Sequence, residues 1–116
     1  TYAALRNKAG QKVEPVAGAF RAAAANADWA GSAENGFYVL LTDQPGAASW
    51  PITATTYILI YRQPPDPAAT ATTLKFFKWA FENGQQAAAS LDYVPLPPNA
   101  VSAIELSWKT VAGSGM

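Results

Sequence analysis

The sequence contains neither cysteine nor histidine and carries little charge. Without cysteine, neither a disulfide nor a thiolate nucleophile or ligand is possible. Without histidine, the commonest general base and the commonest metal ligand are absent. Charged residues make up 14% of the 116 residues, and eight basic and eight acidic side chains balance to zero. A neutral chain has no electrostatic footprint for nucleic acid or for an anionic membrane surface.

The carboxylates are scattered rather than paired, and no two of them are three or four residues apart. They are Glu14, Asp28, Glu34, Asp43, Asp66, Glu82, Asp92 and Glu105. Acid–base catalysis and cation binding both need such groups to be clustered. We therefore expect no catalytic residue, no metal site and no cofactor, and interpret the chain as non-enzymatic. The longest apolar run is also far short of the roughly 20 residues that span a bilayer.

The most informative segment is a predicted strand that ends with five apolar residues, Tyr57 to Tyr61. Both faces of such a strand are apolar, which is typical of a central strand in a sheet covered by helices on each side. The rest of the chain offers one short candidate neighbour, Phe37–Leu41. We therefore predict an α/β fold whose remaining strands come from elsewhere in the polypeptide, from a partner chain or from a swapped dimer.

Helices are predicted on both sides of this strand. The first opens at Glu14-Pro15, because proline is tolerated in the first turn of a helix. The others are expected at about 68–83, at 85–91 and from a cap at Asn99 to about 111. Gly84 suits a left-handed position after the second of these helices, and Gly10 suits a turn in a polar N-terminal connection.

Five local patterns follow one another in a fixed order. They are Ala24-Ala25-Asn26-Ala27-Asp28-Trp29, Ser49-Trp50-Pro51-Ile52-Thr53, Tyr57-Ile58-Leu59-Ile60, Leu74-Lys75-Phe76-Phe77-Lys78-Trp79-Ala80 and Leu91-Asp92-Tyr93-Val94-Pro95-Leu96-Pro97. In this order and spacing the chain resembles the C-terminal third of the periplasmic phosphate-binding proteins of ABC-type phosphate uptake systems. The resemblance covers about residues 5–111.

This resemblance implies a fragment of a two-lobed periplasmic-binding-protein fold of type II. Residues 1–52 would be the C-terminal part of the second lobe, residues 53–60 a strand that crosses the hinge, and residues 61–116 the helical completion of the first lobe. The hinge itself would be formed by Trp50, Pro51, Ile52 and Thr53. The central strand would then pair with strands of the missing N-terminal portion.

The resemblance also implies partners and a location. The expected partners are inorganic phosphate in the intact protein, the permease subunits of the transporter and the missing N-terminal portion. The expected location is the periplasm, with any export signal upstream and removed. The phosphate ligands of this family lie in motifs upstream of Thr1, so no phosphate-binding residue is expected in this chain. The alternative function is a structural or interaction module that folds as a strand-paired or swapped homodimer.

Two further groups of residues allow a functional or a purely structural interpretation. The hydroxyls of Thr53, Thr55 and Thr56 and the guanidinium of Arg62 could contact an anion, but threonine is also a common strand residue and Arg62 can be a solvated strand end. The segment Lys75–Trp79 alternates basic and aromatic residues as in a nucleic-acid stacking surface. Helical spacing instead points Phe77 inward and the lysines outward, which indicates an ordinary amphipathic helix.

Overall fold

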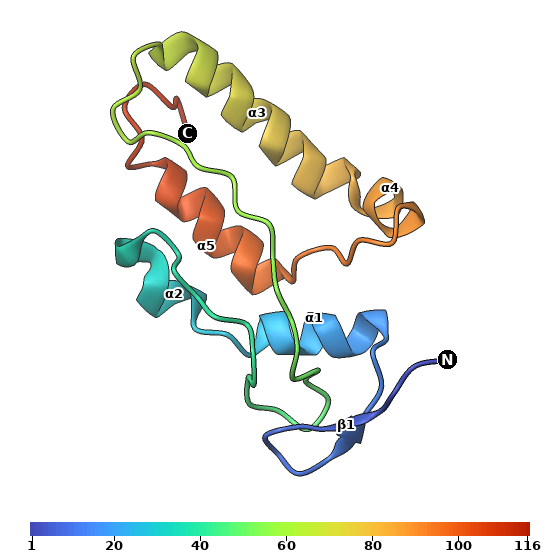
Figure 1. Cartoon of the computed structure of the whole chain (residues 1–116). Coiled ribbons are helices and arrows are strands. Elements are labelled where there is room, and N and C mark those ends of the chain that lie inside the picture. Colours follow the sequence, from blue (N-terminus) through green and yellow to red (C-terminus); the bar gives the residue numbers. More distant parts are fainter.

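The computed structural model describes residues 1–116, and helices dominate it (Figure 1). The strands are β1 (Leu5–Arg6) and β2 (Lys12–Val13). The helices are α1 (Ala17–Ala25), α2 (Trp29–Ser32), the 3-10 turn η1 (Ala33–Asn35), α3 (Pro67–Asn83), α4 (Gln85–Ser90) and α5 (Pro98–Trp108). None of the helices is both long and apolar enough to cross a membrane.

The molecule is flat and open for its length. Its principal extents are 48 × 30 × 18 Å and its radius of gyration is 15.8 Å, whereas a compact domain of this size has a radius of about 13 Å. Its accessible surface is 7808 Å², against about 6,100 Å² for a folded monomer of this mass. Only 16 of the 116 residues are buried. The chain therefore leaves unburied much of the apolar surface that a closed domain would cover.

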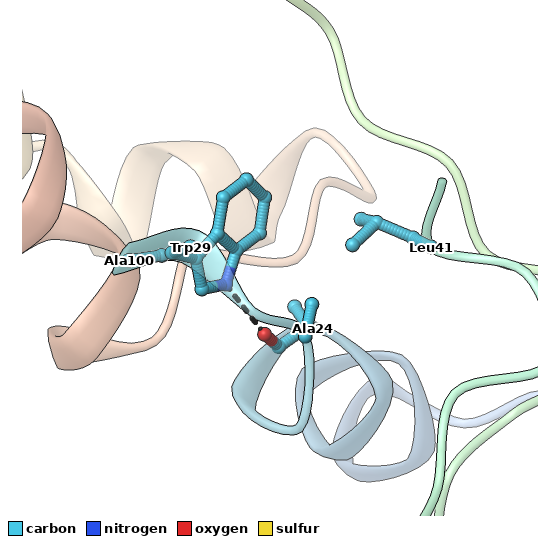
Figure 2. Packing of buried hydrophobic residues seen from close by; sticks show 5 residues of the cluster. Ala24, Trp29, Leu41 and Ala100 are labelled. Carbon is cyan, nitrogen blue, oxygen red and sulfur yellow. Dashed lines mark hydrogen bonds between the residues drawn. The ribbon is translucent and has the colours of Figure 1, made fainter. Parts of the chain in front are cut away.

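The first of two small cores joins the N-terminal half to α5. Trp29 packs with Ala24, Leu41 and Ala100, and its indole Nε1 donates a hydrogen bond to the Ala24 carbonyl oxygen at 2.7 Å (Figure 2). Alanines at the contact let the helices approach closely. Asn99 adds a bond from its Nδ2 to the carbonyl oxygen of Ala25 at 3.0 Å. The start of α5 is thus fixed to the end of α1.

The second core lies between α3 and α5. Leu74 is fully buried there with Trp108 and Val111. The rings of Phe81 and Trp108 stack with centroids 5.9 Å apart and an angle of 13° between their planes. This confirms the predicted inner face of α3, because Leu74 and Phe81 lie seven residues apart, about two helical turns.

Helix boundaries agree with the sequence where a side chain caps the helix. Asp66 accepts a bond from the Ala69 N–H at 3.0 Å, and Pro67 occupies the first turn, so α3 begins one residue before the prediction. The helix expected from Glu14-Pro15 begins instead at Ala17. Two predictions about helix ends were wrong. Gly84 has a φ of −87°, not a left-handed one, because its N–H continues the helical pattern to Ala80.

The second wrong prediction concerns the cap of α5. Asn99 lies inside the helix, which begins at Pro98 with Pro97 as its cap residue. The Asn99 side chain is engaged with α1, as described above, and makes no cap hydrogen bond. A tertiary contact thus replaces the local one that the sequence suggested.

Neither predicted strand forms within this chain. Phe37–Leu41 is irregular, and residues 53–60 run as a coil from the neighbourhood of α1 toward the start of α3 (Figure 1). A strand is defined by pairing, and no second extended segment of this chain lies in register beside residues 53–60. The one sheet is the antiparallel pair β1–β2, in which Leu5 faces Val13. Gly10 lies in the intervening turn with a φ of +76°, as expected.

Candidate functional site

The candidate site is the stretch from Asp43 to Arg62, which contains the predicted hinge. It divides into two parts that differ in their hydrogen bonding. Residues 43–53 form a loop that we call the entry loop. Residues 54–61 form an extended coil that we call the unpaired segment.

The predicted hinge residues end the entry loop, and three of the four are held by specific contacts. Trp50 is 7% exposed, its ring centroid lies 6.1 Å from that of Phe20, and its N–H donates to the Ala19 carbonyl oxygen at 3.0 Å. The carbonyl oxygen of Pro51 accepts a bond from the Asp43 N–H at 2.9 Å. The buried Thr53 hydroxyl donates to the Trp50 carbonyl oxygen at 3.0 Å. Ile52 is exposed.

Asn7, which the sequence did not single out, organises the first half of the entry loop. It is 6% exposed, and its Nδ2 lies within hydrogen-bond distance of three carbonyl oxygens, those of Gly46 (3.2 Å), Ala47 (2.9 Å) and Ser49 (3.1 Å). Its Oδ1 accepts a bond from the Gln11 N–H at 2.9 Å. One amide side chain therefore joins the β1–β2 turn to the loop. No sequence motif indicates this role, because the partners are about 40 residues away.

Ser49 is the second polar residue that closes the loop, and it is completely buried. Its hydroxyl donates to the Pro45 carbonyl oxygen at 2.6 Å and accepts a bond from Asn26 Nδ2 at 3.2 Å. Gly46 turns beside it with a φ of +108°, and a Cβ on this glycine would lie 2.5 Å from Asn26 Nδ2. Every buried side-chain polar atom of the chain has a hydrogen-bond partner. The entry loop is thus a satisfied structural unit.

The unpaired segment has the opposite character. None of its backbone N–H or C=O groups takes part in a hydrogen bond within the chain. Several of its large apolar side chains face solvent, with Leu59 93% exposed and Ile58 59% exposed. The Tyr57 hydroxyl makes one exposed bond, to the Val39 carbonyl oxygen at 2.9 Å. Beyond the segment, the Arg62 carbonyl oxygen accepts from the Ala112 N–H at 2.8 Å, which fixes its downstream end.

Two hollows border the unpaired segment. The first, of about 320 Å³, lies against the second core and is lined by Phe77, Phe81 and Trp108 among others; 13 of its 19 lining residues are hydrophobic. The second, of about 570 Å³, lies beside α1 and is lined by Arg21, the threonines and Tyr93. The apolar lining of the first suits packed side chains rather than a small charged ligand.

The structure brings the candidate anion contacts together only in part. Thr53, Thr55 and Thr56 all line the second hollow, but the Thr53 hydroxyl is already bonded. Arg62 lines the first, mainly apolar hollow, which Thr55 and Thr56 also border, and takes part in no salt bridge. Arg21 and Asp92 both border the second hollow, so its opposite charges offer no net attraction for an anion. The geometry therefore favours the structural interpretation of these threonines.

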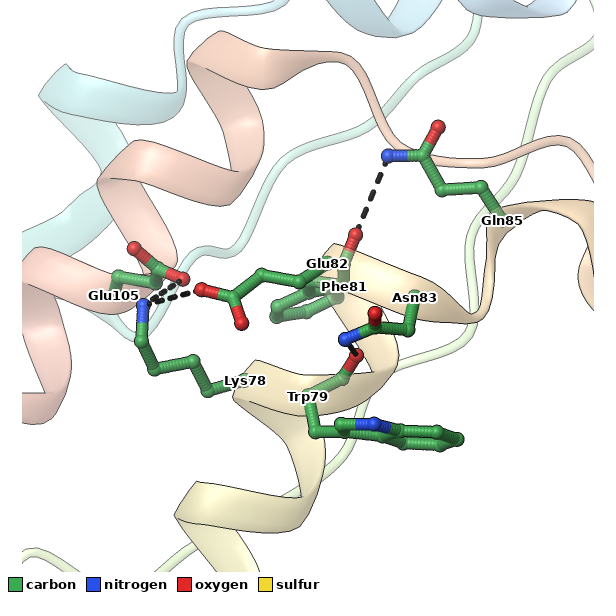
Figure 3. Close-up of polar contacts among 7 residues, drawn as sticks. All are labelled: Lys78, Trp79, Phe81, Glu82, Asn83, Gln85 and Glu105. Atoms are coloured by element: carbon green, nitrogen blue, oxygen red, sulfur yellow. Dashed lines mark hydrogen bonds and ion pairs between the residues drawn. The ribbon is translucent and has the colours of Figure 1, made fainter.

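Helix α3 carries charges that serve to join helices. Lys78 Nζ lies 2.9 Å from Glu82 Oε1 and 3.4 Å from Glu105 Oε1 of α5 (Figure 3). The hydrogen bond that Lys78 donates to Glu82, and then the charge of Glu105, raise the pKa of Lys78 above its ordinary value. Phe76 and Trp79, on the opposite face, are both more than half exposed. No group of three or more carboxylates is close enough to hold a metal ion.

Comparison with known proteins gives the same family for each similar sequence. The chain is 53% identical over 108 residues to the phosphate-binding protein PstS of Xylella fastidiosa strain 9a5c, covering 93% of this chain and 29% of that protein. It is 47% identical over 109 residues to the PstS of Pasteurella multocida, covering 94% of this chain and 31% of that protein.

A third relative, the PstS of Haemophilus influenzae, is also 47% identical over 109 residues, which are 94% of this chain and 32% of that protein. No protein-family model matches the chain. The chain spans about three-tenths of the length of the relatives that it matches, and the match takes in the entry loop and the unpaired segment together. The predicted resemblance is confirmed, and this chain is a PstS-like sequence that corresponds to about three-tenths of such a protein.

Proposed function

We propose that this chain is the C-terminal scaffold and hinge portion of a periplasmic phosphate-binding protein that delivers inorganic phosphate to an ABC transporter. In the intact two-lobed protein, residues 1–52 complete the second lobe and residues 61–116 complete the first. The unpaired segment crosses between the lobes and becomes a central strand of the first. The role is binding and delivery, not catalysis.

The observation that carries this proposal is the pairing capacity of the unpaired segment. Eight consecutive residues offer backbone donors and acceptors that no group of this chain bonds, and such groups would have to pair if a lobe buried them, because buried backbone groups are almost always paired. Their side chains are β-branched, aromatic or aliphatic beyond Thr56, as in strands that are buried on both faces. The relatives supply, outside the matched region, about 70% of their length in which such neighbouring strands can lie.

The large accessible surface area of the chain supports the same proposal. The excess of accessible area over that of a compact monomer is about 1,700 Å², which is about twice the roughly 800 Å² that one partner contributes to a standard protein–protein interface. The first hollow opens onto this surface beneath the unpaired segment. A sheet added there would cover Ile58 and Leu59 and close the second core.

The phosphate ligands belong to the remainder of the protein on this account. The Thr53 hydroxyl is already bonded, and Thr55, Thr56 and Arg62 border a hollow with a mainly apolar lining, which supports placing the anion site outside this chain. The chain contributes instead to the response to phosphate. Phosphate that contacts both lobes favours the closed state by its differential affinity for that state, and the chain segment between the lobes must permit this closure.

A chimera tests the proposal. In the Xylella fastidiosa PstS, the matching 29% is replaced by this chain, which is 53% identical to it. We expect the chimera to bind phosphate with an affinity within about tenfold of that of the parent PstS, measured by calorimetry. The isolated 116-residue chain is the control and should bind phosphate weaker than millimolar.

Each outcome has a definite meaning. A folded chimera that does not bind phosphate would contradict the proposal. Micromolar binding by the isolated chain would also contradict it, because the site would then lie in these residues. A concentration-dependent dimer of the isolated chain, in which residues 57–60 gain amide protection, would favour the strand-paired homodimer instead.

A further inference from the structure

We infer that bending between the two lobes is confined to Ala54, Thr55 and Thr56, and that Asn7 is the positioning residue that sets the upstream limit of this bend. The inference rests on the proposed function. It moves the bend downstream of the predicted hinge, Trp50–Thr53, and assigns a role to a residue about 40 positions away from it in sequence.

The upstream limit follows from the bonds of the entry loop. A hinge residue must change its φ and ψ while its neighbours keep theirs. Trp50 cannot do so without losing its bond to Ala19 and its contact with Phe20, and Thr53 cannot do so without losing its bond to Trp50. The loop therefore moves as one body with α1 and the β1–β2 hairpin.

The downstream limit follows from the apolar run that begins at Tyr57. Once residues 57–60 pair as a strand, their backbone is held by the ladder bonds on both sides. Ile60 already packs on the second core, and the Arg62 carbonyl is bonded to Ala112. The bond from the Tyr57 hydroxyl to Val39 is exposed and can be exchanged for one to water. These residues therefore move with α3 and α5.

Three residues remain between the two bodies, and their properties suit a bend. Ala54, Thr55 and Thr56 have no backbone hydrogen bond to break. Their side chains are small, and all three line the open second hollow, so the space beside them can change shape. Ala54 and Thr56 are exposed and Thr55 is half-buried, so a change of φ and ψ here displaces no fully buried side chain.

Asn7 matters because its single amide holds three carbonyl oxygens of the loop. Nδ2 has two hydrogens to share among the oxygens of Gly46, Ala47 and Ser49, so the three carbonyls must converge on one point. Replacement by alanine leaves the inward-facing carbonyls of Ala47 and Ser49 with no donor, and leaves that of Gly46 with only the 3.3 Å bond from the Ser49 N–H. Since such unpaired buried groups are costly, the loop would open to water and its end, Trp50–Thr53, would join the bend.

Relaxation dispersion of the backbone amides in the phosphate-binding chimera tests this inference, since closure motions occur in microseconds to milliseconds. With phosphate below saturation, we expect exchange broadening to be greatest between Thr53 and Tyr57, at Ala54, Thr55 and Thr56. Trp50, Ile52 and Thr53 should show at most about one-third of that broadening. Broadening centred on Trp50–Thr53 in the unsubstituted protein would overturn the inference. The proposed function is tested separately, by the phosphate titration of the chimera.

Asn7→Ala is the decisive variant and Asn83→Ala its matched control. Asn83 is an exposed asparagine whose Nδ2 bonds within its own helix, to the Trp79 carbonyl oxygen. We expect Asn7→Ala to extend the broadening to Trp50–Thr53 and to raise the exchange of the Trp50 amide by about tenfold. Asn83→Ala should change neither. An unchanged Trp50 amide in Asn7→Ala would overturn the role of Asn7.

A second pair of variants tests the position of the bend, and does so even if Asn7→Ala fails to fold. Ala54→Pro and Ile52→Pro each fix one φ, and the structure gives neither residue a backbone bond to lose. We expect Ala54→Pro to slow phosphate-induced closure by at least about tenfold and Ile52→Pro to slow it less than about threefold. The reverse order would place the bend in the predicted hinge and overturn the inference.

Discussion

The entry loop and the unpaired segment are consecutive and lack regular secondary structure. The loop nevertheless has buried residues and backbone hydrogen bonds within the chain, whereas the segment has neither. The loop, residues 43–53, buries Ser49, Trp50 and Thr53 and bonds its backbone to β1–β2 and α1. The segment, residues 54–61, exposes most of its apolar side chains, and none of its own backbone groups makes a hydrogen bond within the chain. An irregular loop is therefore no sign of missing structure, whereas an apolar segment without partners is.

The amino-acid composition of the two parts explains why only the entry loop has its backbone hydrogen-bonded within the chain. The loop contains serine, proline and glycine, which form turns and local side-chain bonds, and from outside the loop Asn7 and Asn26 bond the Ala47 carbonyl oxygen and the Ser49 hydroxyl. The segment contains tyrosine, isoleucine and leucine, which fit a pleated surface between neighbouring strands. The first set finds its partners within 116 residues, and the second needs partners from outside them.

The largest effect on this contrast is expected from removing the aromatic anchor of the loop. Trp50→Ala should lower the free energy of unfolding of the isolated chain by about 3 kcal/mol, since it empties a buried aromatic site. Leu59→Ala, in the unpaired segment, should lower it by less than about 0.5 kcal/mol because that side chain is already in solvent. Guanidinium unfolding followed by circular dichroism measures both. Equal losses of unfolding free energy in the two variants would contradict the distinction between a packed entry loop and an unpacked segment.

A smaller effect is expected from the turn of the entry loop. Gly46→Ala should cost about 1–3 kcal/mol, because φ is +108° and the new Cβ would meet Asn26 and Ser49. Gly18→Ala is the matched control, in α1 with open space around its Cβ position. It should stabilise the chain by about 0.5–1 kcal/mol, as alanine does in a helix. If Gly46→Ala leaves the free energy of unfolding unchanged, the loop can adjust its backbone more easily than its hydrogen bonds indicate.

The smallest effect is expected from the exposed ion pairs of Lys78. Since its pKa is raised in the folded state, this stabilisation is fully present below the ordinary pKa of 10.5 and is lost as the pH rises through the raised value. Lys78→Gln should therefore be slightly less stable than the unsubstituted chain at pH 7 and equal to it at a pH well above 10.5. Lys75→Gln, which breaks no salt bridge, is the control. A difference that grows above pH 10.5 would contradict this assignment.

The helices were largely predictable because their signals are local. Asp66-Pro67 marks the start of α3, and the spacing of Leu74, Phe77 and Phe81 fixes its inner face. The prediction of the α5 cap failed because a contact distant in sequence decides the outcome. Asn99 donates to the Ala25 carbonyl oxygen of α1 instead of capping its own helix, and no sequence pattern predicts this contact.

The site was predictable in its apolar part and not in its polar part. The run from Tyr57 to Tyr61 indicated a strand that lacks neighbours, and the structure leaves it unpaired. The fixed end of the loop depends on Asn7, whose partners lie 39 to 42 residues away. A single asparagine in a polar segment has no pattern that could reveal this. The lobe boundaries and the hinge stay predictions.

Amide hydrogen exchange of residues 57–60 tests the central claim most directly, measured once in the isolated chain and once in the chimera with the remainder of PstS. The account predicts no protection in the isolated chain and at least about hundredfold slower exchange in the chimera, because those N–H groups would then donate to neighbouring strands. Equal exchange in the two proteins would show that the unpaired segment is not completed by the rest of a PstS protein, and would contradict the account.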